Sequence, residues 1–386
     1  MGRGLPAVMA VALLLPSLVQ AQRMRDEEGV VWGSFRIRPV AEALGAYDNR
    51  VLVDELSGDA EGDLYAELTG ALYFENLPAQ YDFSAYTAYG YRFYRDYIGL
   101  DDDFYKAGVA VASSQNPLKL GVSAFLKKTL DYDTMYEVSS GQEPGAILTG
   151  NPSTRYTATA NVAYERNLAG KTSIEPGYEA RYYFQDFQDE DDAEWVEHRA
   201  GLRIGYDYSE KTRLFLTGYY LFQTAENEEG SIGAATLGAE GRFSGKTSWR
   251  AHVGIAAADY EHSGTDQGLV GLLRGNWEIT EKLSAYIYGS SNYQPGYGGS
   301  NAREVQRLGY GANWRIVSRW RIMVQVLHDY REELDRPGGG EVGNFISAET
   351  GYDLTKRFTV GGRVRYAMDE EEHDQAVVAL SAVYRY

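Results

Sequence analysis

The sequence contains no cysteine, and this absence excludes disulfide bonds, thiol chemistry and cysteine-based metal sites. Beyond the first 21 residues it has no long apolar run, and its mean hydropathy is −0.41, which excludes a helical membrane protein. Basic residues are too few to balance the acidic ones, 37 against 55, so the formal net charge is −18. Such a charge argues against binding to nucleic acid or to an anionic membrane surface.

Histidine is also scarce, with five residues, and no pair has the His-x-x-His or His-x-x-x-His spacing of a metal site. His198 and His328 fall on the apolar register of their predicted strands near a loop end, as polar tips at a membrane interface do. His262, beside Ser263 and Asp266, is the best candidate for hydrolytic chemistry. The acidic segment 186–194 lacks the glycine and ligand spacing of an EF-hand loop. We therefore predict no metal site and no cofactor.

The first 21 residues have the pattern of a cleavable signal peptide. Arg3 gives a short positive start, the stretch 5–19 is apolar, and Val19-Gln20-Ala21 is a small-x-small cleavage site. No cysteine follows that site, so a lipoprotein anchor is not expected. The predicted division of the chain is a signal peptide over 1–21, a short periplasmic segment over 22–33 and a single barrel domain over 34–386.

Aromatic residues and glycine are abundant, with 32 tyrosines, 6 tryptophans and 43 glycines, as in a large β protein with aromatic belts and tight turns. Between the turns, side chains alternate between a bulky apolar face and a charged or small face. In the stretch 358–368, for example, Val360, Val364 and Tyr366 alternate with Arg363 and Arg365. This dyad pattern is typical of strands with lipid on one side and water on the other.

Short polar turns and longer acidic loops follow one another at intervals of roughly 35 to 40 residues, a length that holds two strands. The pattern predicts an all-β, transmembrane, antiparallel up-and-down β-barrel of about 18 strands with both ends on the periplasmic side. A barrel of about 16 to 18 strands usually holds an aqueous channel. The expected strands are 34–47, 63–74, 80–93, 103–112, 119–129, 155–165, 172–187, 193–208, 212–225, 231–243, 247–260, 267–279, 283–293, 302–316, 320–330, 341–352, 357–368 and 375–386.

The last strand, QAVVALSAVYRY, is predicted to close the barrel. Tyr384 and Tyr386 end its apolar face, and the chain stops on the terminal aromatic residue. A transmembrane sheet must pair its last strand with its first, because an open edge cannot stay in lipid. We therefore predict that Tyr384 and Tyr386 belong to the closing strand.

Charged residues on the predicted water side of the strands are the candidate functional residues. They could line a pore and set its ion preference, or they could pair across the wall and only stiffen the barrel. The sequence leaves both readings open. The predicted pore-lining residues are Arg36, Arg38, Glu179, Arg181, Glu197, Arg199, Arg203, Arg307, Arg315, Arg363 and Arg365.

Residues 31 to about 110 resemble the start of the beta-barrel porin (type 2) family of outer-membrane proteins. The matching motifs are Gly33-Ser34-Phe35-Arg36-Ile37-Arg38-Pro39, Gly45-Ala46-Tyr47-Asp48-Asn49-Arg50-Val51 and the aromatic stretch 89–94. Family members tend to have Asn one place later than Asn49. The resemblance implies an outer-membrane pore, and some relatives are associated with export of cell-surface polysaccharide. It brings no catalytic residues.

Together these observations predict a non-enzymatic outer-membrane pore, for diffusion of small polar solutes or for export of cell-surface polysaccharide. The expected partners are outer-membrane lipid, lipopolysaccharide, the barrel-assembly machinery and, for an exporter, polysaccharide export components. Two alternatives are an outer-membrane β-barrel hydrolase and a secreted soluble β-propeller. A propeller blade packs four short strands into a repeat of about 40 residues, whereas this chain repeats two long ones.

The stretch 133–154 differs from the other connections because it is long and has few charges. It contains Ile147 and Leu148 within an apolar run, which a fully solvated loop would not need. We predict that it folds into the lumen as a constriction, with Glu137 and Glu143 opposite arginines of the wall. Packing over the barrel mouth or at a subunit interface is the alternative.

Replacing residues 135–150 with a short Gly-Ser linker tests the constriction. If the loop narrows the channel, the variant should show a severalfold higher single-channel conductance in planar bilayers, because the narrowest section of a pore dominates its resistance. Unchanged conductance in a correctly folded variant would rule the constriction out.

Overall fold

The structure is a computed structural model. It describes residues 29–53, 60–76, 81–96, 102–113, 117–129, 153–187, 193–225, 229–262, 264–294, 303–334, 340–369 and 375–385. Among these residues, no helix is long and apolar enough to cross a membrane. The predicted signal peptide, the constriction-loop residues Glu137, Glu143, Ile147 and Leu148, and Tyr386 lie outside the described residues.

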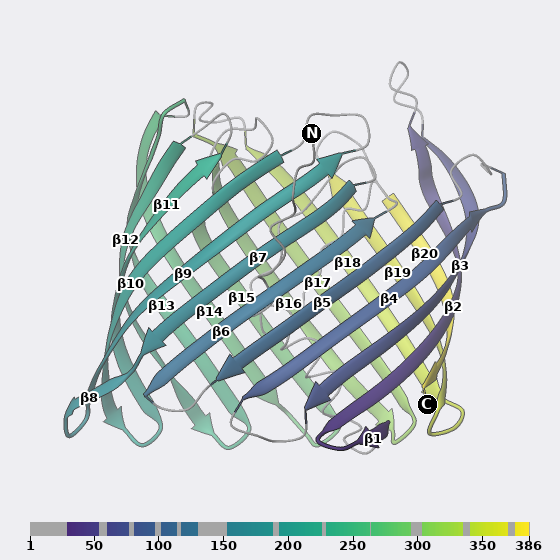
Figure 1. Cartoon of the computed structure of the whole chain (residues 1–386), viewed down its shortest axis with the longest axis horizontal. Helices are drawn as coiled ribbons and strands as arrows, with labels where there is room; N and C mark the ends of the chain where they lie inside the picture. Colours follow the sequence, from purple (N-terminus) through teal and green to yellow (C-terminus); the bar gives the residue numbers. More distant parts are fainter. Residues whose placement is uncertain are drawn as a thin grey trace.

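Twenty strands form one sheet, which Figure 1 shows as a wall of tilted strands. Two are short: β1 (Val30–Trp32) and β8 (Arg166–Ala169). The other eighteen make the wall, in agreement with the predicted number. They are β2 (Phe35–Val53), β3 (Ala60–Asn76), β4 (Asp82–Tyr94), β5 (Asp102–Ser113), β6 (Leu118–Thr129), β7 (Ser153–Tyr164), β9 (Thr172–Phe187), β10 (Ala193–Ser209), β11 (Thr212–Ala225), β12 (Glu229–Ser244), β13 (Thr247–Tyr260), β14 (Gly264–Glu278), β15 (Leu283–Gln294), β16 (Arg303–Val317), β17 (Trp320–Glu333), β18 (Glu341–Asp353), β19 (Phe358–Asp369) and β20 (Gln375–Arg385).

Every wall strand is antiparallel to its two neighbours, and the last strand closes the sheet on the first. The closing ladder between β2 and β20 runs from Val40↔Arg385 to Asp48↔Val377. Tyr384 lies within it, opposite Ala41 on one side and Phe358 on the other. Closure removes the free edge that an open sheet would expose, which confirms the predicted antiparallel barrel.

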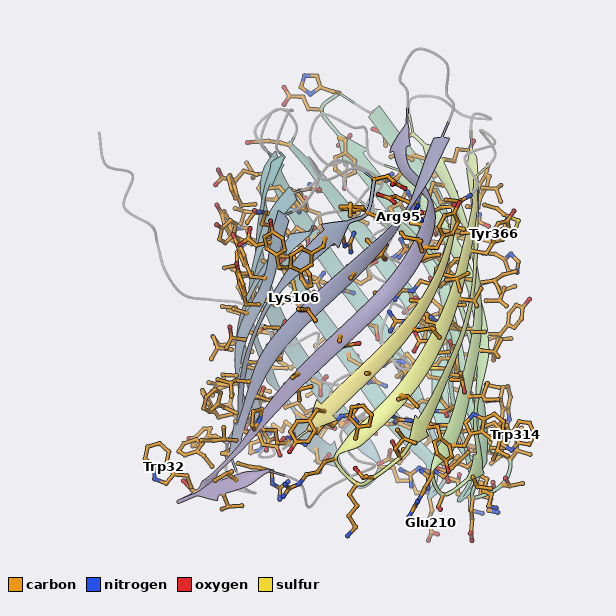
Figure 2. The ribbon with its side chains drawn as sticks, turned by 90° about the vertical axis from the view of Figure 1, so that its right-hand side faces the viewer. Trp32, Arg95, Lys106, Glu210, Trp314 and Tyr366 are labelled. Atoms are coloured by element: carbon orange, nitrogen blue, oxygen red, sulfur yellow. The ribbon has the colours of Figure 1, made fainter. Side chains whose placement is uncertain are left out.

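The strand period of two places apolar side chains on the outside of the barrel. On β10, for instance, Leu202, Ile204 and Tyr206 are exposed and alternate with Arg203 and Gly205. Figure 2 shows Trp32 and Trp314 pointing away from the barrel near its lower end. A closed barrel with an apolar outer face and outward aromatic residues is the architecture of bacterial outer-membrane proteins. The protein is an outer-membrane β-barrel.

The two ends of the barrel differ, as the sequence predicted. The lower end in Figure 1 carries tight turns, among them 170–171, 210–211 and 245–246, and the chain ends there. Gly170 has φ of 54°, a left-handed conformation that glycine adopts without steric cost. Short turns mark the periplasmic end of such barrels, so the longer connections of the upper end face the cell exterior.

The short strand β1 lies just before the wall, inside the segment 22–33 for which no structure was predicted. After a turn at Gly33, which has φ of 62°, it folds back on the start of β2 with Trp32 opposite Phe35. The closing strand β20 reaches only as far as Val40 on this edge of β2. β1 therefore covers the part of the β2 edge that β20 leaves open.

Deleting Tyr384 to Tyr386 should abolish assembly of the barrel. The deletion removes ladder positions that β20 makes with both β19 and β2, so the edges of these strands would lie unpaired in lipid. The expected product is a protease-sensitive periplasmic chain, detected by fractionation and by loss of heat-modifiable migration in detergent. A heat-modifiable barrel recovered from this truncation would contradict the closure argument.

Candidate functional site

The interior face of the barrel is the candidate functional site, because most of its charged residues lie there. On this face the register places all eleven predicted pore-lining residues, each alternating with outward apolar neighbours as Arg199 and Arg203 do with Leu202. Cross-strand pairing brings several of them side by side, such as Glu179 with Arg199. Whether these residues line a conducting path stays a prediction.

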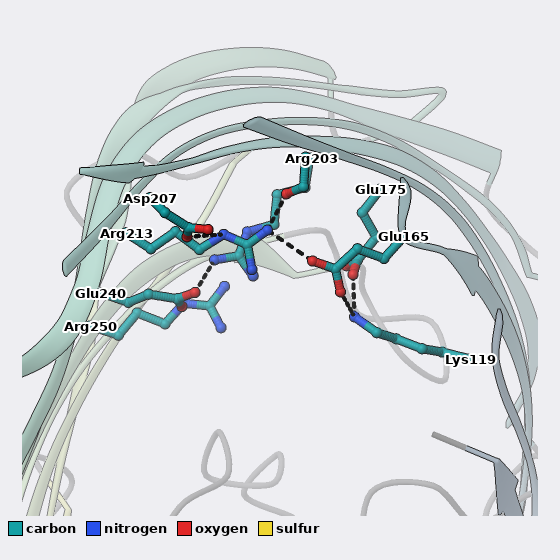
Figure 3. A network of polar contacts seen from close by, with 9 residues as sticks. Lys119, Glu165, Glu175, Arg203, Asp207, Arg213, Glu240 and Arg250 are labelled. Atoms are coloured by element: carbon teal, nitrogen blue, oxygen red, sulfur yellow. Dashed lines mark hydrogen bonds and ion pairs between the residues drawn. The ribbon is translucent and has the colours of Figure 1, made fainter. Parts of the chain in front are cut away.

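The most extensive group of charges lies near the periplasmic end, on the concave side of the wall (Figure 3). Glu165, at the break between β7 and β8, accepts a hydrogen bond from Arg213 Nη2 at 2.9 Å and pairs with Lys119 Nζ at 3.0 Å. Lys119 also reaches Glu175 on β9. Asp207 Oδ1 lies 3.7 Å from Arg213 Nε. Four strands of the wall are thereby joined through side chains, in addition to their backbone ladders.

The same group continues along the wall through Glu240 on β12. Glu240 accepts a hydrogen bond from Arg203 Nη2 at 2.6 Å, and its other oxygen lies 3.7 Å from Arg250 Nε. Both arginines also stack on the Phe215 ring, at 4.2 Å and 5.3 Å from its centroid. Because the group combines Glu165, Glu175, Asp207 and Glu240 with Lys119, Arg203, Arg213 and Arg250, its opposite charges balance. This arrangement agrees with the interpretation that the charged residues pair across the wall and stiffen the barrel.

Further ion pairs lie along the remaining wall. Glu75 on β3 pairs with Arg36 at 3.2 Å and with Arg38 at 2.6 Å. Arg363 on β19 pairs with Glu349 on β18 at 2.6 Å. Each of these bridges joins adjacent strands and leaves its carboxylate partly exposed. These ion pairs compensate the positive charge of predicted pore-lining arginines, while the paired groups remain partly exposed to water.

Arg181 on β9 is compensated in a different way, since it lies between two acidic residues. It pairs with Glu179 on its own strand at 2.6 Å and approaches Glu197 on β10 at 3.7 Å. Glu197 is buried, whereas Glu179 stays partly exposed. Arg199, opposite Glu179 in the ladder, brings a second positive charge to this cluster, so its charges balance.

A buried ion triad lies on β16 and β17. Asp329 accepts hydrogen bonds from Arg307 Nε and Arg331 Nε, both at 2.8 Å. The Asp329 side chain is 1% exposed and that of Arg307 is 4% exposed. Because a buried charge needs a partner, this triad is the part of the interior whose electrostatics most affects folding.

Some interior cations form no close ion pair among the described residues, among them Lys106 on β5, Arg199 on β10 and Arg321 on β17. Arg199 instead stacks over the Tyr219 ring, 3.9 Å from its centroid, and faces Glu179 in the ladder with β9. These residues belong to separate parts of the wall. They can therefore give the lumen a positive potential at more than one place.

The described histidines lie apart in the sequence and on different strands, with His198 on β10, His252 on β13, His262 just beyond the end of β13 and His328 on β17. His198 forms a hydrogen bond with Tyr178, and His328 forms one with Asn344. Both histidines lie on the outer face, as the register predicted. His262 has no hydrogen-bond or ion-pair partner among the described residues, and Asp266 accepts a hydrogen bond from Tyr293 instead. Ser263 lies outside the described residues. Within the described ranges, no group of His, Asp and Glu is arranged to hold a metal ion.

The sequence-based set omitted several members of the interior network. Lys119, Glu165, Glu175, Asp207 and Arg213 all have the same alternation as the residues that were chosen. All five lie inside the predicted strands 119–129, 155–165, 172–187, 193–208 and 212–225, so the alternation marks them although the set did not include them. Applying the alternation to the full length of each strand would have found them.

No family model and no curated protein matches this chain. Among solved structures, it is similar to Pseudomonas aeruginosa OccK2 (OpdF), at 12% identity and a TM-score of 0.48 over 93% of this chain and 99% of that one. It is also similar to a BenF-like porin from Pseudomonas fluorescens Pf-5, at 9% identity and a TM-score of 0.47 over 91% and 98%. Pseudomonas aeruginosa OpdK with vanillate matches at 13% identity and 0.45, over 91% and 98%.

Similarities at this level carry no argument about function. The fold assignment rests on the strand ladder of the chain itself, from β2 round to β20. That ladder shows the barrel that the resemblance to the beta-barrel porin (type 2) family implied.

Asp329→Ala should lower the free energy of unfolding by about 3–5 kcal/mol, because it leaves Arg307 buried without its anion. The loss can be measured as a shift of the urea midpoint of heat-modifiable migration. Glu75→Ala is the matched control. It removes a carboxylate that also bonds two arginines but is partly exposed, so the expected loss is about 1 kcal/mol or less. Equal losses of unfolding free energy in the two variants would show that the buried triad stabilises the fold no more than a partly exposed ion pair does.

Proposed function

We propose that the protein is a passive outer-membrane channel through which small polar solutes, preferentially anions, diffuse. The observation that carries this proposal is the interior face, where charged and polar residues from around the wall surround the axis of an 18-strand barrel. No described strand or helix lies within that ring. Barrels of this strand number are too wide for wall side chains alone to fill.

The preference for anions follows from the distribution of compensated charges. Most interior carboxylates with a described position bond at least one arginine or lysine, as Glu75, Glu165, Glu240 and Glu349 do. Lys106, Arg199 and Arg321 form no close ion pair among the described residues, but Arg199 faces Glu179 and Lys106 acts on Glu42, so the proposed preference is modest. Acidic residues of the exterior loops act weakly inside, because salt screens charges over about 8 Å at physiological ionic strength.

Polysaccharide export, the other function that the resemblance implied, has no observation in its favour among the described residues. Export also requires further protein components, whereas diffusion requires only the barrel and its lipid. The proposed partners are therefore outer-membrane lipid and lipopolysaccharide, with the barrel-assembly machinery acting during insertion of the closing strand β20.

A planar bilayer with a potassium chloride gradient tests this proposal. The reversal potential of the wild-type protein should lie closer to the equilibrium potential of chloride than to that of potassium. The triple variant Lys106→Gln, Arg199→Gln, Arg321→Gln should move that potential towards the equilibrium potential of potassium, because it removes positive charges that form no close ion pair. Lys246→Gln, which removes one charge in an exposed periplasmic turn, is the control and should leave the potential unchanged.

Two results would count against the proposal. Clear cation selectivity of the wild-type channel would contradict the preference for anions. Absence of any conductance, together with no swelling of proteoliposomes in small sugars, would contradict the channel itself.

A further inference from the structure

The backbone ladder between β14 and β15 stops before either strand ends. It runs from Glu278↔Ser284 to Gly271↔Ser291 and goes no further within the described residues. β14 continues to Gly264 paired with β13, and β15 continues to Gln294 paired with β16. Gly264–Val270 and Asn292–Gln294, in the exterior half of the wall, are therefore not paired with each other through their backbones. We refer to this gap as the β14–β15 opening.

Side chains occupy the opening in place of a ladder. Ser291 Oγ donates a hydrogen bond at 3.0 Å to the backbone carbonyl of Leu269. Tyr293 Oη donates one at 2.8 Å to Asp266 Oδ2. A Cβ atom added to Gly268 would lie 2.6 Å from the same hydroxyl, so the hydroxyl would have to shift if that residue had a side chain. These contacts can break without breaking strand pairing.

Tyr293 crosses from the outer face of the wall to the inner one. Its register partner Glu304 is on the outward face, where Glu304 also bonds Ser291 and Gln306. The Tyr293 ring nevertheless packs with interior residues and is 6% exposed. Asp266 and Ala258, which are register partners, lie on the interior side. The ring therefore fills the passage between the two faces.

Apolar side chains lie on both sides of the opening. On the interior it adjoins a cluster made of Ile232, Ala256, Ala258, Tyr260, Val270 and Tyr293, in a wall that elsewhere carries many charges. On the outside, Leu269 is exposed, as are Val253 and Ile255 on the neighbouring strand. Polar groups lie beside these apolar residues, with Asp266 on the interior side and Ser291, Glu304 and Gln306 on the outward face.

We propose that the β14–β15 opening is a lateral portal through which amphipathic molecules pass between the lumen and the outer leaflet of the membrane. An apolar chain or ring remains in contact with apolar surface on both sides, and its polar head finds hydrogen-bond partners at the rim. A complete ladder would prevent such passage, because strand pairing would have to break in lipid. Tyr293 is the gate, since its movement clears the passage.

This portal is an additional route beside axial diffusion of polar solutes. It requires the barrel and the opening but not the anion preference of the channel, and the two proposals can fail separately. Single-channel conductance, measured on each variant below, reports the axial route alone.

Cysteine labelling in proteoliposomes tests the portal, since the native chain has no cysteine. Ala256→Cys places a thiol in the apolar cluster beside the opening, and Ala379→Cys places one elsewhere on the interior wall. Both alanines are 4% exposed, which makes the second a matched control. Each protein is treated with a long-chain alkyl maleimide dissolved in the vesicle membrane, or with a small charged maleimide in the buffer.

The portal predicts that the ratio of membrane-borne to water-borne labelling is several-fold higher for Ala256→Cys than for Ala379→Cys. Adding Tyr293→Ala should raise the ratio further at Ala256→Cys only. Tyr293→Phe, which keeps the ring but loses the bond to Asp266, should stay closer to the wild type than Tyr293→Ala. Equal ratios at the two cysteines in the wild-type background would overturn the proposal, even if the Tyr293 variants failed to fold.

Discussion

The requirement that every backbone polar group in lipid finds a partner is the constraint on which this structure depends. A strand cannot satisfy its own N–H and C=O groups, so the sheet must close on itself. The ladder from Val40↔Arg385 to Asp48↔Val377 meets this requirement at the seam. β1 extends it by covering the edge of β2 that β20 does not reach. The outward apolar residues can then face lipid, because the closed sheet leaves no strand edge with unpaired N–H and C=O groups beside them.

Closure also concentrates charge inside. Side chains that alternate with the apolar face all point towards one axis, where repulsion or loss of hydration would destabilise the wall. Most of these charges are compensated by partners on nearby strands, as Arg363 on β19 and Glu349 on β18 are, and a buried group is compensated twice, at Asp329. In the proposed channel, interior cations that form no close ion pair, such as Lys106 and Arg321, would act on a passing solute.

The β14–β15 opening shows where the backbone constraint is relaxed. There Ser291 and Tyr293 supply hydrogen bonds that a ladder would otherwise make, and Gly268 gives the tyrosine its space. Side-chain bonds of this kind can exchange without unzipping a strand. A barrel can thus keep its wall intact over most of its circumference and remain adjustable at one place.

The sequence by itself determined the fold class, the eighteen wall strands and the face on which Arg36, Arg203 or Leu202 lies, because alternation has a period of two and needs no partner. It did not determine strand ends: β2 continues to Val53, whereas alternation was followed only to Tyr47. Only the tertiary structure decided that Glu165 joins Lys119 to Arg213, that Asp329 is buried, and that the ladder stops at Ser291. These features depend on the register between strands, and alternation within one strand carries no information about the stagger of the next.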